Sequence, residues 1–299
     1  MDFKNTLKPV HLFLTLLTVV VWGVNFIAIY IGLKDLPPFL FCTIRFALSA
    51  FPFVFFVPKP KTNFKLLVGF GLFNFVLQFG LLFSGIQLGL SPGLSSLIMQ
   101  VQVFFSIGLA FLFFGEKPGF IKVLGSLISF VGIGVVAVNI NGSATIVGLL
   151  LTLLASFSWA AGNMFTKKIQ AESPLALVIW GNLIAFPFMA VTSYFIDGAP
   201  LIIHSLQNIS WATVVAITYV VYVSTFLGYS IWGFLLKKYT TSAVVPYTLL
   251  IPVVGFFSSA VYLKEELTDW KLWASFFIMI GIVFNIFEAK IRFLLKTIK

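Results

Sequence analysis

The polar side chains that lie inside apolar segments are the residues of this sequence best placed to do chemistry. Arg45 is the one ionised residue well inside such a segment, eight residues past Pro37, or about 12 Å of helical rise. In a membrane, a charge at this depth costs about 2.5–3.5 kcal/mol. A guanidinium binds a carboxylate through two parallel hydrogen bonds, so Arg45 is a candidate for holding a substrate carboxylate. The alternative is a structural Arg45 that bonds backbone carbonyls or extends toward the membrane surface.

Amide and aromatic side chains recur on single faces of several predicted helices. Thr15, Thr18, Trp22 and Asn25 share one face, and Thr152, Ser156, Trp159 and Asn163 share another. Such residues also join helices to one another, at about 0.6–2 kcal/mol each. Because the pattern recurs on five helices, we expect a wet, aromatic-lined cavity. The substrate-binding candidates are Trp22, Asn25, Arg45, Gln78, Gln100, Gln102, Trp159, Asn163, Tyr222, Tyr229 and Tyr247.

Two prolines lie within one apolar segment near the C-terminus, in "VVPYTLLIPVVG". Pro246 and Pro252 each free a backbone carbonyl, which predicts a broken helix that serves as a gate or hinge. The alternative is a kink that only helps the helices to pack.

Several kinds of chemistry lack their residues in this sequence. Asp and Glu do not occur in the middle of any apolar segment, so an intramembrane carboxylate relay has no evident carrier. The GxxxxGK phosphate loop is absent, and no Ser-His-Asp set or metal-ligand cluster is evident. We therefore expect no catalytic residues, no metal and no cofactor, and a protein that is not an enzyme.

The composition indicates a protein that is dissolved in a membrane. Of 299 residues, 60% are hydrophobic and 9% are charged. A chain of this composition has more apolar surface than a soluble fold buries. The net charge of +10 would suggest nucleic acid in a soluble protein. Here the basic residues lie in short loops, where they act as topology signals, so no nucleic-acid partner is expected. Cys42 is alone, so no internal disulfide forms.

Ten segments are long and apolar enough to cross the bilayer as helices. They are residues 10–33, 37–57, 66–88, 92–114, 119–139, 146–166, 174–196, 210–235, 243–263 and 270–289. The first is too long for the apolar region of a signal peptide, and no small-residue cleavage site follows it. We expect it to be retained as the first span.

The loop charges predict the orientation. With the N-terminus inside, only Lys34, Lys264 and Lys271 fall in outside loops, whereas every other Lys and Arg except Arg45 falls inside. Because Lys and Arg favour cytoplasmic loops, both termini are predicted to be cytoplasmic.

The chain also repeats itself. "LTLLTVVVW" begins at Leu14 and "LTLLASFSW" at Leu151, and Pro37 and Pro174 keep the same offset of 137 residues. Later the offset becomes 150, between Glu116 and Glu266. The predicted fold is therefore all-α, with ten transmembrane helices in two inverted five-helix repeats around a central cavity. The repeats cover residues 1–140 and 141–299.

One helix of each half is expected at the edge of this fold. In the fifth span, Gly125, Ser129, Gly132 and Gly134 are small residues without polar reach, which predicts close helix packing. Spans 5 and 10 are expected at the periphery or against another protomer, so a homodimer is left open.

Several stretches resemble the EamA family of the drug/metabolite transporter superfamily. They are "VVVWGVNFIAIYIGLKDLPP", "IRF" around Arg45, "GLSSLIMQVQVFFSIGLAFLFFGE", "SWAAGNMFTKKI" and "IPVVG". They spread over both halves and cover most of the chain. The run from Gln100 to Phe-Gly-Glu is similar to that of the amino-acid metabolite exporters, which include a cysteine and O-acetylserine exporter.

The resemblance implies a multi-pass secondary transporter of the bacterial inner membrane. It implies export of small amino acids or amino-acid metabolites through a central cavity by alternating access, without ATP. The alternative is an importer or exchanger of a larger metabolite such as S-adenosylmethionine. On either reading, the partners are a small-molecule substrate and the lipid bilayer.

Overall fold

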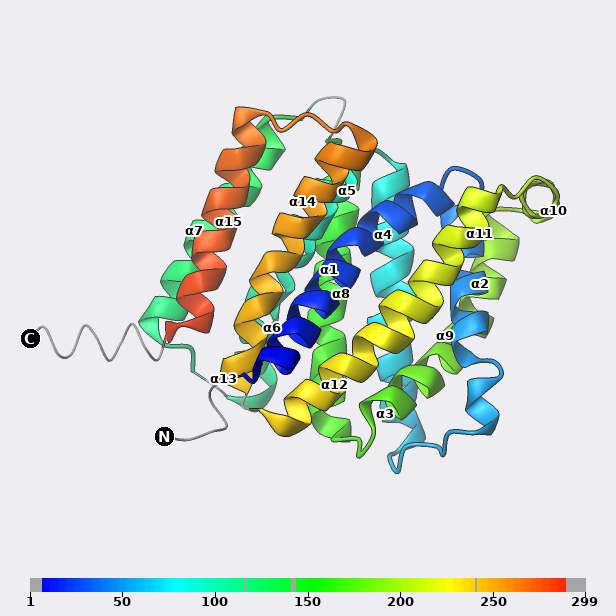
Figure 1. The fold of residues 1–299 in the computed structure, drawn as a ribbon, viewed down its shortest axis with the longest axis horizontal. Coiled ribbons are helices and arrows are strands. Elements are labelled where there is room, and N and C mark those ends of the chain that lie inside the picture. Colours follow the sequence, from blue (N-terminus) through cyan, green and yellow to red (C-terminus); the bar gives the residue numbers. More distant parts are fainter. Residues whose placement is uncertain (1–6, 116, 141–143, 240, 289–299) are drawn as a thin grey trace, which may run out of the picture.

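The computed structural model describes residues 7–115, 117–140, 144–239 and 241–288. Its regular elements in these ranges are all helices (Figure 1). Nine helical segments of these ranges are long and apolar enough to cross a membrane, and a further apolar helix, Tyr247–Leu263, is shorter. The predicted all-α membrane fold is confirmed. Glu116 and the two chain ends, on which part of the sequence analysis rests, lie outside the described residues.

The first half of the chain forms five apolar segments, several of which are divided. Its helices are α1 (Pro9–Gly32), α2 (Pro38–Ala50) with a 3-10 turn at Phe53–Phe55, α3 (Phe64–Gly71), a π-helix (Leu72–Leu77), α4 (Gln78–Gln87), α5 (Pro92–Met99), α6 (Gln102–Phe114) and α7 (Phe120–Val138).

The second half has a similar order of spans, with a short helix added after its second span. Its helices are α8 (Ile146–Ile169), α9 (Pro174–Ile196), α10 (Ala199–Gln207), α11 (Trp211–Thr218), a π-helix (Tyr219–Leu227), α12 (Gly228–Lys238), α13 (Thr241–Val244), a 3-10 turn (Val245–Leu249), α14 (Leu250–Leu263) and α15 (Asp269–Ile286). The additional element is the short helix α10, where the sequence indicated only a long loop.

Local sequence signals explain where the helices begin. Proline opens α1, α2, α5 and α9, where its missing amide would have had no helical partner in any case. Serine caps several starts: the hydroxyl of Ser173 accepts a hydrogen bond from the amide of Ala176 at 3.2 Å, and that of Ser210 from the amide of Thr213 at 3.2 Å. These signals fix the ends of the spans and hence the depth of each polar side chain.

Irregular turns occur at corresponding places in the two halves. The third span of each half contains a π-helix, and the fourth span of each half is interrupted. In the first half the interruption is the turn at Gln100 and Val101, between α5 and α6. In the second half it is the 3-10 turn Val245–Leu249. Irregular backbone at membrane depth is tolerated where it is buried in protein or lines a cavity, so these turns point to the middle of the bundle.

The two halves are interlocked rather than set side by side. Helix α1 packs against α11, α12, α14 and the second π-helix, whereas α8 packs against α3, α4, α5, α6 and the first π-helix. The first helix of each half therefore packs mainly against the third and fourth spans of the other half. Helices α2 and α9 also pack on each other. The start of α1 and the end of α15 lie at one end of the bundle, opposite α10 (Figure 1).

Helices α7 and α15 form a pair at one side of the bundle (Figure 1). A Cβ on Gly125 would lie 2.6 Å from the carbonyl oxygen of Gly281, and one on Gly132 would lie 2.8 Å from that of Ala274. Ser129 donates a hydrogen bond to the carbonyl of Ile278 at 3.0 Å. The predicted close packing is present at these residues. It does not extend to Gly134, where a Cβ would have no neighbour within 4 Å.

Candidate functional site

Arg45 lies on the buried face of α2, and only 4% of it is exposed. Its guanidinium carbon is 3.8 Å from the ring centroid of Phe79 on α4, a cation–π contact. Nη2 donates a long hydrogen bond of 3.5 Å to the hydroxyl of Thr225. Nη1 is buried and has no hydrogen-bond partner in the described residues. The guanidinium thus has two hydrogen-bonding groups turned to the interior and little in the protein to satisfy them.

Aromatic side chains lie beside this cation. The ring centroid of Trp22 is 5.5 Å from that of Tyr229 and 5.3 Å from that of Trp232. The indole nitrogen of Trp22 donates to the carbonyl oxygen of Ser224 at 3.1 Å. Trp22 and Arg45 thus bond to adjacent residues of the second π-helix, Ser224 and Thr225. Three of the predicted site residues, Trp22, Arg45 and Tyr229, therefore form one group around the second π-helix, which we call the arginine cluster.

The π-helices explain how α1 and α8 are held at this depth. A π turn widens the helix and disturbs its regular hydrogen bonds, so carbonyls become available to donors from other helices. Trp22 of α1 binds such a carbonyl in the second π-helix, and Ser158 of α8 binds the carbonyl of Phe73 in the first, at 2.8 Å. The two halves thus use the same kind of contact. Each contact anchors the first helix of one half to the third span of the other.

The amide side chains predicted for the site are buried. Asn25, Gln78 and Gln100 are each less than a tenth exposed, and Oδ1 of Asn25 has no hydrogen-bond partner in the described residues. Gln100 lies in the turn that interrupts the fourth span, between α5 and α6. An unpartnered buried carbonyl such as that of Asn25 is costly, and it suits a donor from a ligand or from water.

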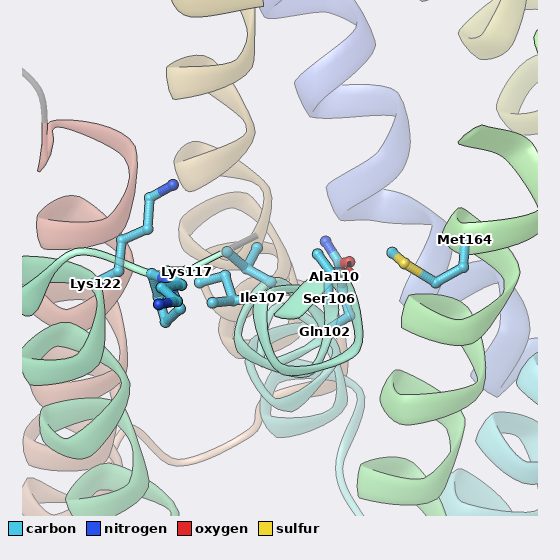
Figure 2. Close-up of a pocket in the computed structure, with 9 residues that line it drawn as sticks. Gln102, Ser106, Ile107, Ala110, Lys117, Lys122 and Met164 are labelled. Carbon is cyan, nitrogen blue, oxygen red and sulfur yellow. Dashed lines mark hydrogen bonds between the residues drawn. The ribbon is translucent and has the colours of Figure 1, made fainter. Parts of the chain in front are cut away.

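A second group of predicted residues is the pair Gln102 and Asn163, of which Gln102 lines a cavity of about 410 Å³ along α6. Oε1 of Gln102 accepts hydrogen bonds from Nδ2 of Asn163 at 3.1 Å and from the hydroxyl of Ser106 at 3.3 Å. Figure 2 shows Gln102, Ser106 and Ala110 of α6 facing Met164 of α8, with Lys117 and Lys122 on the side toward α7. The lining is completed by Val103, Ile107 and Pro118. It includes no member of the arginine cluster, so the structure separates the predicted residues into two groups.

The remaining predicted aromatic residues belong to neither group. Trp159 packs against the main hydrophobic core, as does Tyr247 of the 3-10 turn Val245–Leu249. Tyr222 is 43% exposed and its ring stacks on that of Phe226.

The two predicted hinge prolines lie near the start of α14. Pro246 is in the 3-10 turn that precedes α14, and Pro252 is buried in the first turn of α14 itself. Both positions belong to the interruption of the fourth span in the second half. There, a residue that donates no amide hydrogen bond is readily accommodated.

The structure also contains a buried ion pair that sequence reasoning missed. Lys271, assigned to an exposed outside loop from the sequence, is 1% exposed. Its ammonium lies 3.0 Å from Oε1 of Glu265 and donates to the carbonyl of Glu266 at 2.8 Å. The hydroxyl of Ser91, at the start of α5, donates to the same carboxylate oxygen. The one sequence signal was a lysine that follows two acidic residues at the start of an apolar helix.

Other carboxylates join the two halves at the same end of the bundle. Oδ2 of Asp35 accepts from the hydroxyl of Ser210 at 2.5 Å, from the hydroxyl of Thr213 at 2.7 Å and from the amide of Ser210 at 2.9 Å, and these bonds hold the pKa of Asp35 below its usual value. Oδ2 of Asp197 accepts from the amide of Leu40 at 3.0 Å. Burial raises the pKa of Asp197 all the same. These carboxylates cap helices of the opposite half, which holds this end together.

Comparison with known proteins agrees with the membrane fold. The profile of the EamA-like transporter family matches residues 10–138 and 146–287. Proteins named "Probable amino-acid metabolite efflux pump" from Salmonella typhimurium and Escherichia coli are each 42% identical to this chain. The alignments cover 94% and 95% of this chain and 96% and 97% of those proteins.

A solved structure supports the fold independently. A chain titled "Crystal structure of protein" superimposes with a TM-score of 0.61 at 15% identity, covering 93% of this chain and 97% of that one. Because the family profile matches most of the chain, in two consecutive stretches, this protein belongs to the EamA-like transporter family, which points to a transporter.

Proposed function

We propose that this protein exports small amino acids or amino-acid metabolites as a secondary transporter of the bacterial inner membrane. Its family and the printed names of its relatives support amino-acid metabolite export. In this proposal the two five-helix repeats, 1–140 and 141–299, alternate access to a central path, with both termini in the cytoplasm. The excess of Lys and Arg on one set of loops supports that orientation.

The observation that carries the proposal is the state of Arg45. A buried cation is normally neutralised by a carboxylate, because an unpaired charge in a low-dielectric interior is strongly unfavourable. In the described residues no carboxylate pairs with Arg45, and Nη1 has no hydrogen-bond partner at all. A substrate carboxylate would supply the missing negative charge and accept two parallel hydrogen bonds from the guanidinium. All α-amino acids carry such a group, so Arg45 suits the whole substrate class.

The other predicted residues take roles that follow from their chemistry. The unpartnered carbonyl oxygen of Asn25 would accept a hydrogen bond from the substrate amine, and Gln78 and Gln100 offer neutral amides at similar burial. Trp22 and Tyr229 would form the wall against which the carbon skeleton packs. Trp159, Tyr222 and Tyr247 would line the path when the halves move. The hinge would be the interrupted helix that contains Pro246 and Pro252.

Transport by purified protein in vesicles tests the proposal. Vesicles would be loaded with labelled cysteine, O-acetylserine or S-adenosylmethionine, and release would be followed against protein-free vesicles. We expect the wild-type protein to release cysteine or O-acetylserine. Release of S-adenosylmethionine alone would favour the alternative of a larger metabolite. If neither these compounds nor a wider panel of amino acids is released faster than from protein-free vesicles, the proposal is wrong.

The Arg45→Lys variant tests the role of the guanidinium. It keeps the charge but removes the planar pair of donors. We expect it to recover only a small part of the activity that Arg45→Met loses. Full activity of Arg45→Lys would show that two parallel hydrogen bonds to a carboxylate are not the role of Arg45.

A further inference from the structure

The cavity along α6 has the size and the position of a loading site. Its volume of about 410 Å³ falls in the range of small-molecule sites. It extends along α6 from Gln102, beside the interruption of the fourth span, past Ala110 to the turn that contains Lys117 and Pro118. Gln102 and Ala110 are eight residues apart, or about 12 Å of helical rise. The cavity thus leads from one end of the bundle toward the interrupted middle of the fourth span.

The polar groups of the cavity are mostly hydrogen-bond donors. Oε1 of Gln102 is engaged by Asn163 and Ser106, which leaves the two amide hydrogens of Gln102 as the groups offered to a ligand. Lys117 and Lys122 add two ammonium groups, and among the described residues no acidic side chain lines the cavity. Lys122 lies 3.6 Å from Glu288, a carboxylate outside the lining. The described wall thus offers hydrogen-bond donors and positive charge but no carboxylate. Such a wall suits a ligand group with anionic oxygen atoms, such as a carboxylate.

We propose that this cavity is a loading site that binds the substrate carboxylate before it reaches Arg45. Lys117 and Lys122 attract the carboxylate, and the amide of Gln102 donates to it at the inner end. Met164 and Ile107 supply an apolar wall for the side chain of the substrate. The proposal rests on the export function above and deepens it. It names a second cationic site, on the side of the bundle where the proposed orientation places the cytoplasm.

The phosphate of an anionic lipid head group has the same chemistry as a substrate carboxylate. Basic residues at the end of a membrane helix often attract such lipids, at about 1 kcal/mol per side chain. A substrate carboxylate and a lipid phosphate bound in the cavity would affect transport differently. A substrate site makes KM sensitive to the lysines in any bilayer, whereas a lipid site does so only in bilayers that contain anionic lipid.

The test compares two double variants with the same change of net charge. Lys117→Gln/Lys122→Gln alters the cavity, and Lys59→Gln/Lys65→Gln removes two exposed lysines that do not line it, one in the segment before α3 and one in the first turn of α3. The segment that leads into α3 lies at the same end of the bundle as the start of α1 (Figure 1). Each protein is reconstituted in vesicles of phosphatidylcholine alone and in vesicles with added phosphatidylglycerol. Uptake of labelled cysteine and O-acetylserine is measured from the side on which Lys117 lies. Thermal unfolding of each protein confirms that the variants are folded.

We expect the cavity variant to raise KM about fivefold with kcat unchanged, as two partly exposed charge contacts would give, and in both kinds of vesicle. The KM of the wild type and of the control variant should rise with salt, and that of the cavity variant should rise less. Equal KM values for the two variants would overturn the loading site while leaving export intact. An effect confined to vesicles with phosphatidylglycerol would overturn it in favour of a lipid site. Absence of transport by the wild type would refute the export function itself.

Discussion

Arg45 and Lys271 are both buried in the part of the chain that the structure describes, and their surroundings differ. Lys271 is 1% exposed and Arg45 is 4% exposed. Lys271 lies at one end of the bundle, 3.0 Å from the carboxylate of Glu265, and also donates to a backbone carbonyl. Arg45 lies within α2, against the face of Phe79, with one long hydrogen bond and an unpartnered Nη1.

On the proposed function, this difference separates a structural charge, Lys271, from a substrate-binding one, Arg45. When a charge serves only to hold helices together, the chain supplies the opposite charge, as Glu265 does for Lys271. When the opposite charge comes from outside, the site must be left incomplete in its absence. Burial by itself therefore does not mark a functional charge, whereas a buried charge without a counter-charge is a candidate for one. The predictions below break the partnered site, give the unpartnered one a partner, or remove its charge.

Breaking the pair at Lys271 should give the largest effect. Glu265→Gln leaves a buried ammonium without its counter-charge, and we expect a loss of about 3–5 kcal/mol in the free energy of unfolding. The double variant Lys271→Met/Glu265→Met removes both charges and should recover most of the lost stability. Denaturant-induced unfolding of the protein in detergent measures the free energy of unfolding of the wild type and of each variant. A loss below about 1 kcal/mol for Glu265→Gln would show that this pair is not an important structural contact.

Giving Arg45 an internal partner should abolish transport. Thr225 lies 3.5 Å from Nη2 of Arg45, so Thr225→Glu places a carboxylate where the substrate carboxylate is proposed to bind. We expect transport to fall about 100-fold or more, since a fixed charge-assisted bond competes with the substrate. Thr225→Gln is nearly the same size and uncharged, and it serves as the control. Equal rates for the two variants would contradict the proposed role of Arg45.

Removing the charge of Arg45 should leave stability nearly unchanged. Arg45→Met replaces an unpaired buried cation with an apolar side chain of similar length, a change that is often neutral or stabilising. We expect a change in unfolding free energy within about 1 kcal/mol of wild type, together with loss of transport. A destabilisation as large as that of Glu265→Gln would instead identify Arg45 as a structural residue.

The smallest effect concerns the acids that cap helices at the end of the bundle where Lys271 lies. The pKa of Asp35 is lowered by its hydrogen bonds, so its ionised form stabilises the folded state. That stabilisation is present above the unfolded pKa, about 3.9, and is lost as the pH falls through the lower folded value. Asp35→Asn should therefore lower Tm by a few degrees at pH 7 and by less at pH 3. Thermal unfolding at the two pH values measures this.

The pKa of Asp197 is raised, so the sign of its pH dependence is opposite. Its contribution is most favourable at low pH, where the carboxyl is protonated, and weakens as the pH rises through its folded pKa. Relative to Asp35→Asn, Asp197→Asn should thus lose less stability at pH 7. A larger loss for Asp197→Asn than for Asp35→Asn at pH 7 would contradict this difference.

Much of the fold followed from local features of the sequence. Apolar length predicted the spans, and prolines such as Pro38 and Pro92 predicted where helices begin. The small residues Gly125 and Gly132 predicted a tightly packed pair, which the structure finds between α7 and α15. Helix α10 was missed, because a short surface helix has no strong apolar pattern of its own. The burial of Lys271 was missed because its site is completed by α5, which is far away in sequence: Ser91 at the start of α5 donates to Glu265, the carboxylate that pairs with Lys271.

The sequence by itself determined that this is a helical membrane protein with an arginine inside a span. Helix length, hydropathy and capping are local properties, which a one-dimensional pattern records directly. Only the tertiary structure decided which polar residues meet. It joined Trp22, Arg45 and Tyr229 in one cluster, and it bonded Asn163 to Gln102 at the wall of a separate cavity. The reason is that each cluster is built from helices of both halves, and contacts between distant segments are fixed by packing rather than by spacing.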